Sequence, residues 1–125
     1  MGTNLGREVE FTEQFATWWK SLTEAQQDAL DDRIMLLIAD GPAVGRPAVD
    51  HIESSRHPNM KELRTSSGGA LRVLFAFDPR RSAILLIGGD KSGRWSEWYR
   101  IAIPIADDLY DEHLAELRQE GLLDA

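Results

Sequence analysis

The sequence contains no cysteine, and no part of it is apolar for long. The missing cysteines exclude disulfide bonds and thiolate metal sites, and they fit a protein of the reducing cytoplasm. The longest apolar runs are "IMLLIA" and "AILLI", whereas a membrane-spanning helix needs about 18 apolar residues or more. The first residues, "MGTNLGREVEF", lack the basic and then apolar pattern of a secretory signal. We therefore expect a cytoplasmic protein without a membrane segment.

Motifs of several enzyme classes are missing as well. There is no GxSxG, Walker loop or GxGxxG, and the segments "SSGG" and "GGDKSG" are too short for a nucleotide-binding loop. The three histidines, His51, His57 and His113, do not have the spacing of metal ligands. We therefore expect no metal ion and no cofactor, with His51 in a loop and His113 in a structural role on a helix.

The 125 residues carry a net charge of −7, but the charge is distributed unevenly. Residues 1–53 hold 10 acids and 4 bases, and residues 105–125 hold 7 acids and one base. Residues 54–104 hold 9 bases and 4 acids, a balance of +5. Because salt screens charges beyond about 8–10 Å, this basic middle can attract a polyanion despite the negative total. The alternative is that these arginines are ordinary solvated residues on the outer face of strands.

The length suits one domain with one core, and neither a repeat nor a linker divides the chain, so we expect a single domain over residues 1–125. Residues 7–11 alternate between polar and apolar, which predicts a short strand. Residues 13–40 have apolar residues at helical spacing and predict a helical hairpin. Thr12 and Thr23 are the expected N-caps of its two helices.

After a predicted loop at 42–59, the apolar period changes to two. Residues 60–65, 70–77 and 82–89 are predicted strands, and the short turns "SSGG" and "DPRR" between them predict an antiparallel meander. Residues 106–122 have the pattern of an amphipathic helix. The expected fold class is therefore α+β, with an N-terminal strand and helical hairpin, a three-stranded antiparallel meander and a C-terminal helix.

Basic side chains come from neighbouring parts of this meander. Lys61 and Arg64 belong to its first strand and Arg72 to its second, while Lys91 and Arg94 follow the third. Adjacent strands lie about 4.8 Å apart, so several of these cations could converge on one phosphate. Cleavage of RNA by its own 2′-hydroxyl needs such cations, a base for the hydroxyl proton and an acid for the leaving 5′-oxygen.

Other side chains of the basic region are candidates for the remaining roles. Glu62, which lies among the cations, is a candidate general base, and His57 is a second candidate for proton transfer. Tyr99 or Lys91 could protonate the leaving oxygen. The candidates for stacking on an unpaired base are Trp95 and Trp98.

Three strings in this order resemble the RelE/HigB superfamily of bacterial type II toxins, the ribosome-dependent mRNA interferases. They are "MKELR" at 60–64, "ALRVLFAFDP" at 70–79 and "ILLIGGDKSGRWSEWY" at 84–99. Within the superfamily, the chain is most similar to the HigB-like branch related to phage proteins. The resemblance covers about residues 8–117 and implies a small antiparallel sheet flanked by helices, as the residue pattern also does.

The resemblance also implies roles for individual residues. Arg72 would bind the scissile phosphate, and Lys91 would stabilise the transition state or act as the acid. Tyr99 would stack on or orient the substrate base. Lys61 and Arg64 would bind phosphate.

The partners implied by the resemblance are mRNA on the ribosome and an antitoxin with a helix-turn-helix domain, which would hold the toxin in a hetero-oligomer. Two other functions stay open. One is a ParE-like inhibitor of DNA gyrase, and the other is a noncatalytic member of the fold whose basic sheet binds RNA or a partner. Met60 and Glu62 stand where better-known RelE members carry lysines, and the net charge of the chain is negative. Both features leave the noncatalytic alternative open.

Overall fold

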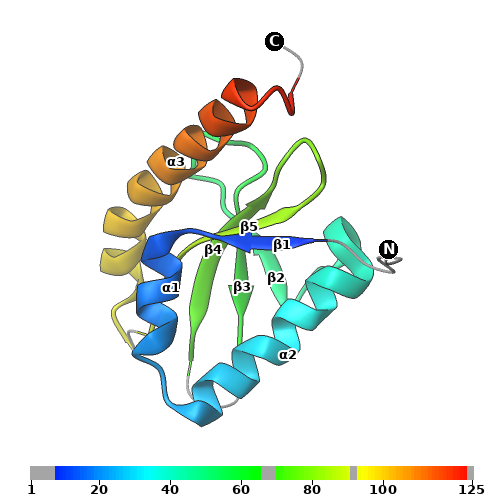
Figure 1. Cartoon of the computed structure of the whole chain (residues 1–125). Helices are drawn as coiled ribbons and strands as arrows, with labels where there is room; N and C mark the ends of the chain where they lie inside the picture. The colour runs from blue at the N-terminus through cyan, green and yellow to red at the C-terminus, as the bar shows by residue number, and fades with distance from the viewer. Residues whose placement is uncertain (1–7, 66–69, 91–92, 124–125) are drawn as a thin grey trace.

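The computed structural model describes residues 8–65, 70–90 and 93–123. Two helices lie on one face of a sheet and a long third helix lies on the other (Figure 1), which confirms the predicted α+β architecture. The elements are β1 (Val9–Phe11), α1 (Glu13–Lys20), α2 (Glu24–Asp40), the short 3₁₀ helix η1 (Gly41–Ala43), β2 (Val49–His51), β3 (Lys61–Arg64), β4 (Arg72–Phe77), β5 (Ala83–Gly89) and α3 (Trp95–Gln119).

The sheet has five strands in the order β1-β5-β4-β3-β2. The predicted meander is its centre, where β3, β4 and β5 pair antiparallel in sequence order. The N-terminal strand β1 adds to β5 in parallel, and it forms one edge of the sheet.

The other edge strand, β2, corrects the prediction of a loop over residues 42–59. Val49–His51 pair antiparallel with β3, so His51 is a strand residue and not a loop residue. The strand was missed because three residues are too few to show a period of two, and Pro47 lies just before it. It is the pairing with β3 that makes this segment a strand.

Both predicted N-caps are present. The Thr12 side chain accepts a hydrogen bond of 3.0 Å from the Phe15 N–H, and its hydroxyl donates to the Leu86 carbonyl at 2.6 Å, which ties the start of α1 to β5. Thr23 and Gln26 form a reciprocal capping box at the start of α2, with distances of 3.1 and 2.9 Å.

The helix α3 begins eleven residues earlier than expected, at Trp95 instead of Ala106. Proline in a helix interior removes a hydrogen bond and usually breaks the helix, yet Pro104 lies inside α3. The helix continues because the apolar stripe does not stop there. Ala102 and Ile103 are buried on the side that faces the sheet, whereas Pro104 is exposed. The segment 95–100, expected in a loop, is therefore the first turn and a half of α3.

Two apolar cores cover the two faces of the sheet, because successive strand residues point to opposite sides. The core between the sheet and helices α1 and α2 includes Phe15, Leu30, Leu37, Leu63 and Phe75. The core under α3 consists of residues from the alternate strand positions and from the helix, among them Met60, Leu74, Leu86, Ala106 and Tyr110.

Two consecutive glycines at the end of β5 let a tryptophan approach each face. A Cβ atom on Gly88 would lie 2.3 Å from the ring of Trp18, which comes from α1. A Cβ atom on Gly89 would lie 2.4 Å from the ring of Trp98, which comes from α3. The pair "GG" therefore sets how closely α1 and α3 pack at this end of the sheet.

A buried carboxylate at the turn between β4 and β5 joins three elements. Asp78 accepts hydrogen bonds from Arg80 and from the backbone N–H of Ser82, and it contacts the ring of His113 on α3 at 2.9 Å. Arg80 also contacts Glu10 of β1 at 2.7 Å. Burial opposes the charge of Asp78, but the bonds from His113 and Arg80 outweigh it and lower the pKa of this carboxyl. His113 thus has the structural role expected of it.

Within the described residues, no helix combines the length and the apolar character that crossing a membrane would require.

The glycine at 89 gives a test of the packing. Replacing Gly89 with Ala should lower the free energy of unfolding by about 1–3 kcal/mol, because the new methyl group overlaps the Trp98 ring. Gly45→Ala is the matched control, since nothing lies within 4 Å of a Cβ atom there. Urea unfolding of the two variants measures the difference, and equal stability would contradict the packing described here.

Candidate functional site

An open hollow lies on the α3 face of the sheet, over β2, β3 and the start of β4. It has a volume of about 620 Å³. Five of its charged or hydroxyl-bearing side chains come from four different elements: Asp50 from β2, Glu62 and Arg64 from β3, Arg72 from β4 and Tyr99 from α3. The sheet register brings them together, because Arg64 lies directly opposite Arg72, and Asp50 directly opposite Glu62.

The carboxylate of Glu62 is the centre of this cluster. Its side chain is only 2% exposed, and both of its oxygens are occupied. Oε2 accepts hydrogen bonds from Nε and Nη2 of Arg64 at 2.9 and 2.6 Å, and Oε1 accepts one from the Tyr99 hydroxyl at 2.5 Å. A buried carboxylate needs such partners to keep its charge, so Glu62 fixes the positions of both side chains.

The Tyr99 hydroxyl, which bonds to Glu62, also contacts Arg72. Nη1 of Arg72 donates a hydrogen bond to the Tyr99 hydroxyl, and its guanidinium lies over the Trp95 ring, 4.3 Å from the centroid. The residue opposite it on β5 is Gly89, so no side chain of that strand competes for the space. The guanidinium is thereby oriented by one hydrogen bond and one cation–π contact, and Arg72 lines the hollow.

The electrostatics keep the Tyr99 phenol neutral. Burial and the Glu62 carboxylate raise the pKa of Tyr99, and the opposing effect of Arg72 does not cancel them. Burial alone would lower the pKa of Arg64, but its bond to Glu62 raises it overall. The cluster therefore places a neutral phenol between the Glu62 carboxylate and the Arg72 guanidinium. That arrangement can bind an anion and can move a proton along the line from phenol to carboxylate.

An aromatic group from the first turns of α3 supports the cluster. The rings of Trp95 and Trp98 meet edge to face at 5.3 Å, and those of Trp98 and Tyr99 at 5.2 Å. Trp98 rests on Gly89 and so anchors the start of the helix to the sheet. Trp95 has Arg72 against one face of its ring. The idea that either tryptophan stacks on a base stays a prediction.

The structure does not bring all of the predicted site residues to the hollow. Lys61 alternates with Glu62 along β3, and it shares the face of Leu63, which packs under α1 and α2. Arg94 is exposed at the start of α3, with its nearest anion, Glu97, at 3.8 Å. Lys91 lies outside the described residues.

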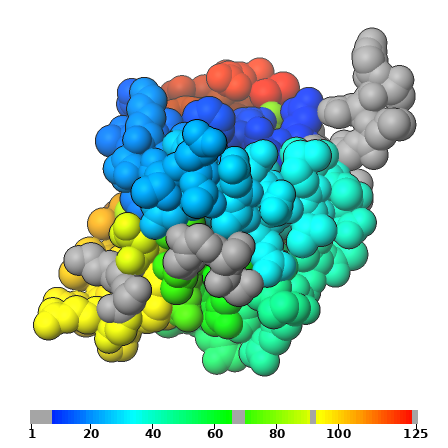
Figure 2. All heavy atoms as spheres, turned by 90° about the horizontal axis from the view of Figure 1, so that it is seen from below, coloured from blue at the N-terminus to red at the C-terminus, as the bar shows by residue number. Residues whose placement is uncertain are grey.

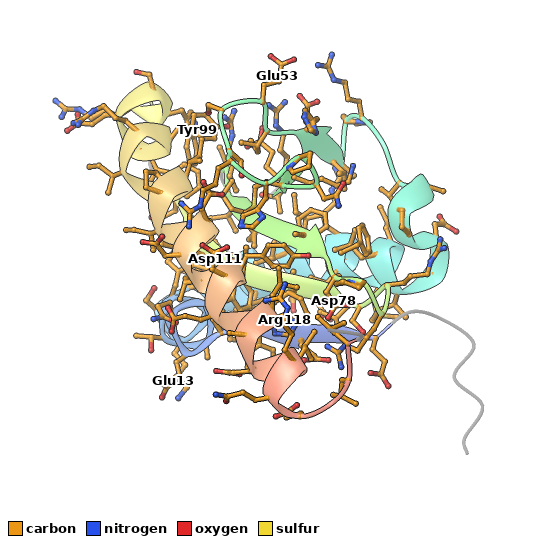
Figure 3. All side chains as sticks on the ribbon, turned by 90° about the horizontal axis from the view of Figure 1, so that it is seen from above. Glu13, Glu53, Asp78, Tyr99, Asp111 and Arg118 are labelled. Carbon is orange, nitrogen blue, oxygen red and sulfur yellow. The ribbon has the colours of Figure 1, made fainter. Side chains whose placement is uncertain are left out.

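His57 is bound elsewhere. Its ring contacts Asp111 at 2.7 Å and packs edge to face on Tyr110 at 4.9 Å. Asp111 lies 12 residues after Tyr99 on the same helix, a rise of about 18 Å along the axis, and Figure 3 shows the two residues well separated along it. The neighbouring Arg56 also bonds to α3, through Asp107, Asp108 and Asp111. Together they fasten the loop between β2 and β3 to the helix, away from the hollow.

Sequence reasoning missed three charged residues of the hollow, Arg46, Asp50 and Glu53, all from the segment predicted as a loop. Asp50 lies 3.5 Å from Arg64 and accepts a bond from Arg46 at 3.2 Å, and Glu53 lies on the rim. A hydrogen bond from the His51 backbone and the bond from Arg46 lower the pKa of Asp50. The only signal in the sequence was the spacing of four between Arg46 and Asp50, which is too common to indicate a site.

Over the ranges 8–65, 70–90 and 93–123, no group of histidines and carboxylates is arranged to hold a metal ion.

Comparison with known proteins identifies the family. The model of the phage-derived Gp49-like proteins matches residues 17–111. The chain belongs to the Gp49-like family. It is 45% identical over 106 residues to the "Putative toxin HigB2" of Mycobacterium tuberculosis, and 47% identical over 102 residues to the "Putative toxin HigB3" of the same organism. These matches cover 83% and 82% of the chain, and 53% and 89% of the two relatives. The chain thus spans about half the length of the first relative.

Solved structures show the same fold. The isolated E. coli RelE toxin superposes with a TM-score of 0.57 at 12% identity, covering 75% of this chain and 96% of RelE. RelE in the archaeal RelE–RelB complex from Pyrococcus horikoshii OT3 gives 0.54 at 16% identity, covering 71% and 98%. With the HigB relatives, they confirm that this Gp49-like chain is a member of the RelE/HigB superfamily of toxins.

The raised pKa of Tyr99 can be measured directly. The chain has two tyrosines, and burial raises the pKa of the other one, Tyr110, to about 12. In a Tyr110→Phe background, the ultraviolet signal of tyrosinate should appear only above pH 10. Glu62→Gln should shift this titration to lower pH, because the carboxylate disfavours the phenolate.

The same shift affects stability in a known direction. A group with a raised pKa in the folded state stabilises the fold fully below its unfolded pKa, and this contribution is lost as the pH rises through the folded value. Stability should therefore fall above pH 10 and less steeply in Tyr99→Phe. A titration that does not respond to Glu62→Gln would contradict the hydrogen bond between the two residues.

Proposed function

We propose that this chain is the toxin of a type II toxin–antitoxin pair and that it cleaves mRNA on the ribosome. Membership of the RelE/HigB superfamily supports the first part. The observation that carries the second is the Tyr99 hydroxyl held between the Glu62 carboxylate and the Arg72 guanidinium, at the wall of a hollow that is open to solvent.

In the proposed reaction the RNA supplies its own nucleophile. The scissile phosphate binds to Arg72, whose guanidinium stabilises the extra negative charge when the 2′-oxygen attacks phosphorus. Glu62 takes the proton of the 2′-hydroxyl through the Tyr99 hydroxyl, which passes its own proton to Glu62 as it accepts the new one. The bond from phosphorus to the 5′-oxygen then breaks, and a 2′,3′-cyclic phosphate and a 5′-hydroxyl result.

The acid for the leaving 5′-oxygen is proposed to be Lys91, as the resemblance implies. Arg64 would assist by bonding to a second phosphate oxygen, which requires it to share its guanidinium between the phosphate and Glu62. The stacking surfaces of Trp95 and Trp98 lie next to Arg72 at the start of α3 and would hold a neighbouring base.

The partner in this proposal is an antitoxin with a helix-turn-helix domain, and the toxin would act in the cytoplasm, where translating ribosomes are. RelE is bound to RelB in the archaeal complex that shares this fold. For the present chain, an antitoxin would hold the toxin inactive in a hetero-oligomer until the antitoxin is degraded.

One observation favours a second candidate, a noncatalytic protein that binds RNA or a partner. In the hollow the cations Arg46, Arg64 and Arg72 face the acids Asp50, Glu53 and Glu62, so the charges balance. Both carboxylate oxygens of Glu62 also already accept hydrogen bonds. These ion pairs and hydrogen bonds would have to be replaced by contacts with RNA before the site could act on it.

Controlled expression with mapping of mRNA ends tests the proposal. We expect cuts that follow the reading frame and that need translating ribosomes. Arg72→Ala and Tyr99→Phe should each reduce cleavage by about 100-fold or more, because phosphate stabilisation and proton transfer each contribute on that order. Arg118→Ala is the matched control, an exposed arginine in the last turn of α3, and should cleave as the unchanged protein does.

Intact mRNA in arrested cells would contradict RNA cleavage, and a DNA-damage response would then indicate gyrase as the target. Binding of RNA without cuts would support the noncatalytic alternative. Cleavage that survives Arg72→Ala at full rate would place the reaction at another site.

A further inference from the structure

Among the described strands, β1 has a neighbour on one side only, the strand β5. The backbone N–H of Thr12 bonds to the carbonyl of Leu85, and that of Ala83 bonds to the carbonyl of Glu8. In a parallel ladder the residues of one strand alternate between the two sides, so Glu8, Glu10 and Thr12 face β5. The N–H and C=O groups of Val9 and Phe11 therefore point away from the sheet, at its outer edge.

An apolar groove runs beside this edge. It is lined by Val9, Phe11 and Leu85 of the sheet and by Phe15, Trp19 and Ile34 of the two helices. Phe11 is 62% exposed, the largest exposed fraction among the large apolar side chains described. A strand edge next to an exposed aromatic ring is unusual in a protein that does not use it, because such an edge pairs readily with another chain.

The surroundings of the groove are acidic. Residues 8–40, which form β1, α1 and α2, hold eight acids and only two bases. One acid and one base, Asp31 and Lys20, line the groove itself, and the exposed Glu8 and Glu13 lie at the two ends of β1. Figure 2 shows the dark blue atoms of β1 at the surface, between the lighter blue helices and the red end of α3. Three acids of this part of the sequence, Glu8, Glu13 and Asp31, thus lie at or beside the edge of β1.

We propose that the edge of β1 and this groove are a docking surface for an extended, basic segment of a partner protein. The segment would add a strand to β1 through the outward groups of Val9 and Phe11. Apolar side chains at every second position would fill the groove, and lysines or arginines between them would meet Asp31 and its acidic neighbours. Net charge complementarity of this kind favours association and selects against acidic partners.

The surface is separate from the arginine hollow. Strand β1 forms one edge of the sheet, and the hollow lies over β2, β3 and β4 toward the other edge. Three strand spacings from β1 to β3 amount to about 14 Å, and the two sites use opposite faces. A partner bound at β1 would therefore leave the hollow open to RNA, unless another part of the partner covers it.

A peptide titration of the full chain tests the surface without an identified partner. The probe is a capped seven-residue peptide of alternating lysine and valine, and its counterpart with glutamate for lysine is the control peptide. We expect the basic peptide to bind with a Kd of about 1 mM or tighter and the acidic one to bind at least tenfold more weakly. Amide resonances of Val9, Phe11 and Trp19 should shift. The amides of Val9 and Phe11 should exchange rapidly in the unbound protein and slow down on binding, which a side-chain contact alone would not cause.

Two variants locate the binding. Phe11→Ser and Asp31→Lys should each weaken the basic peptide about tenfold, and both residues are exposed, so the fold should tolerate the changes. Ile101→Ser is the matched control, an apolar residue 52% exposed on α3, and should bind normally. Equal binding to the Phe11→Ser protein, or shifts confined to the residues around Arg72, would overturn the proposal. So would sedimentation showing a dimer that Phe11→Ser dissociates, since the occupant of the groove would then be a second copy of this chain. None of these outcomes depends on whether the protein cleaves RNA.

Discussion

A carboxylate buried on β3 determines the organisation of the candidate site. Glu62 has almost no contact with solvent, so its charge must be compensated by the protein. Arg64 supplies two hydrogen bonds and Tyr99 a third. Because Tyr99 belongs to α3, this one carboxylate joins the sheet and the long helix. It also makes the direct juxtaposition of Arg64 and Arg72 tolerable, since two cations facing each other on adjacent strands would otherwise repel.

Packing at the end of β5 makes this polar contact possible. Gly89 admits Trp98, and this places the first turn of α3 close enough to the sheet for Tyr99 to reach Glu62. The same residue leaves room beside Arg72, which lies opposite it in the register. The apolar contact and the charged cluster are therefore coupled, and a larger residue at position 89 would disturb both.

The sequence predicted the parts of the structure that depend on local pattern. The caps at Thr12 and Thr23 and the three central strands follow from turn residues and from periods that a few neighbours define. It did not predict β2, whose existence depends on pairing with a strand that comes ten residues later, nor the start of α3, where a proline on the exposed side does not interrupt a buried stripe.

The candidate site, too, could be predicted where it depends on local pattern and not where it depends on tertiary contacts. Arg72, Glu62, Arg64 and Tyr99 were expected from strand order and from the family resemblance, and they are together in the structure. Lys61 lies on the other face of the sheet because side chains alternate along β3. His57 lies away from the hollow because its ring contacts Asp111, a residue that is distant in sequence. Asp50 and Arg46 carried no signal of their own. Their place is fixed by the tertiary fold alone.

The net charge of −7 does not show that acids and bases of the chain lie at different surfaces of the fold. The basic middle of the sequence supplies two of the three arginines of the hollow, Arg64 and Arg72, whereas Asp31 of the acidic N-terminal part lines the groove beside β1. Salt screens these regions from each other over the width of the sheet, so each can select its own partner. Within the hollow, however, cations and acids are already paired. A phosphate that enters must compete with Glu62 and Asp50 for Arg64, and in the proposed reaction the energy of that exchange would come from contacts with the rest of the RNA. A substrate held in place by a larger assembly supplies such contacts more readily than a short free RNA, which is the physical reason for expecting the ribosome in the proposed reaction.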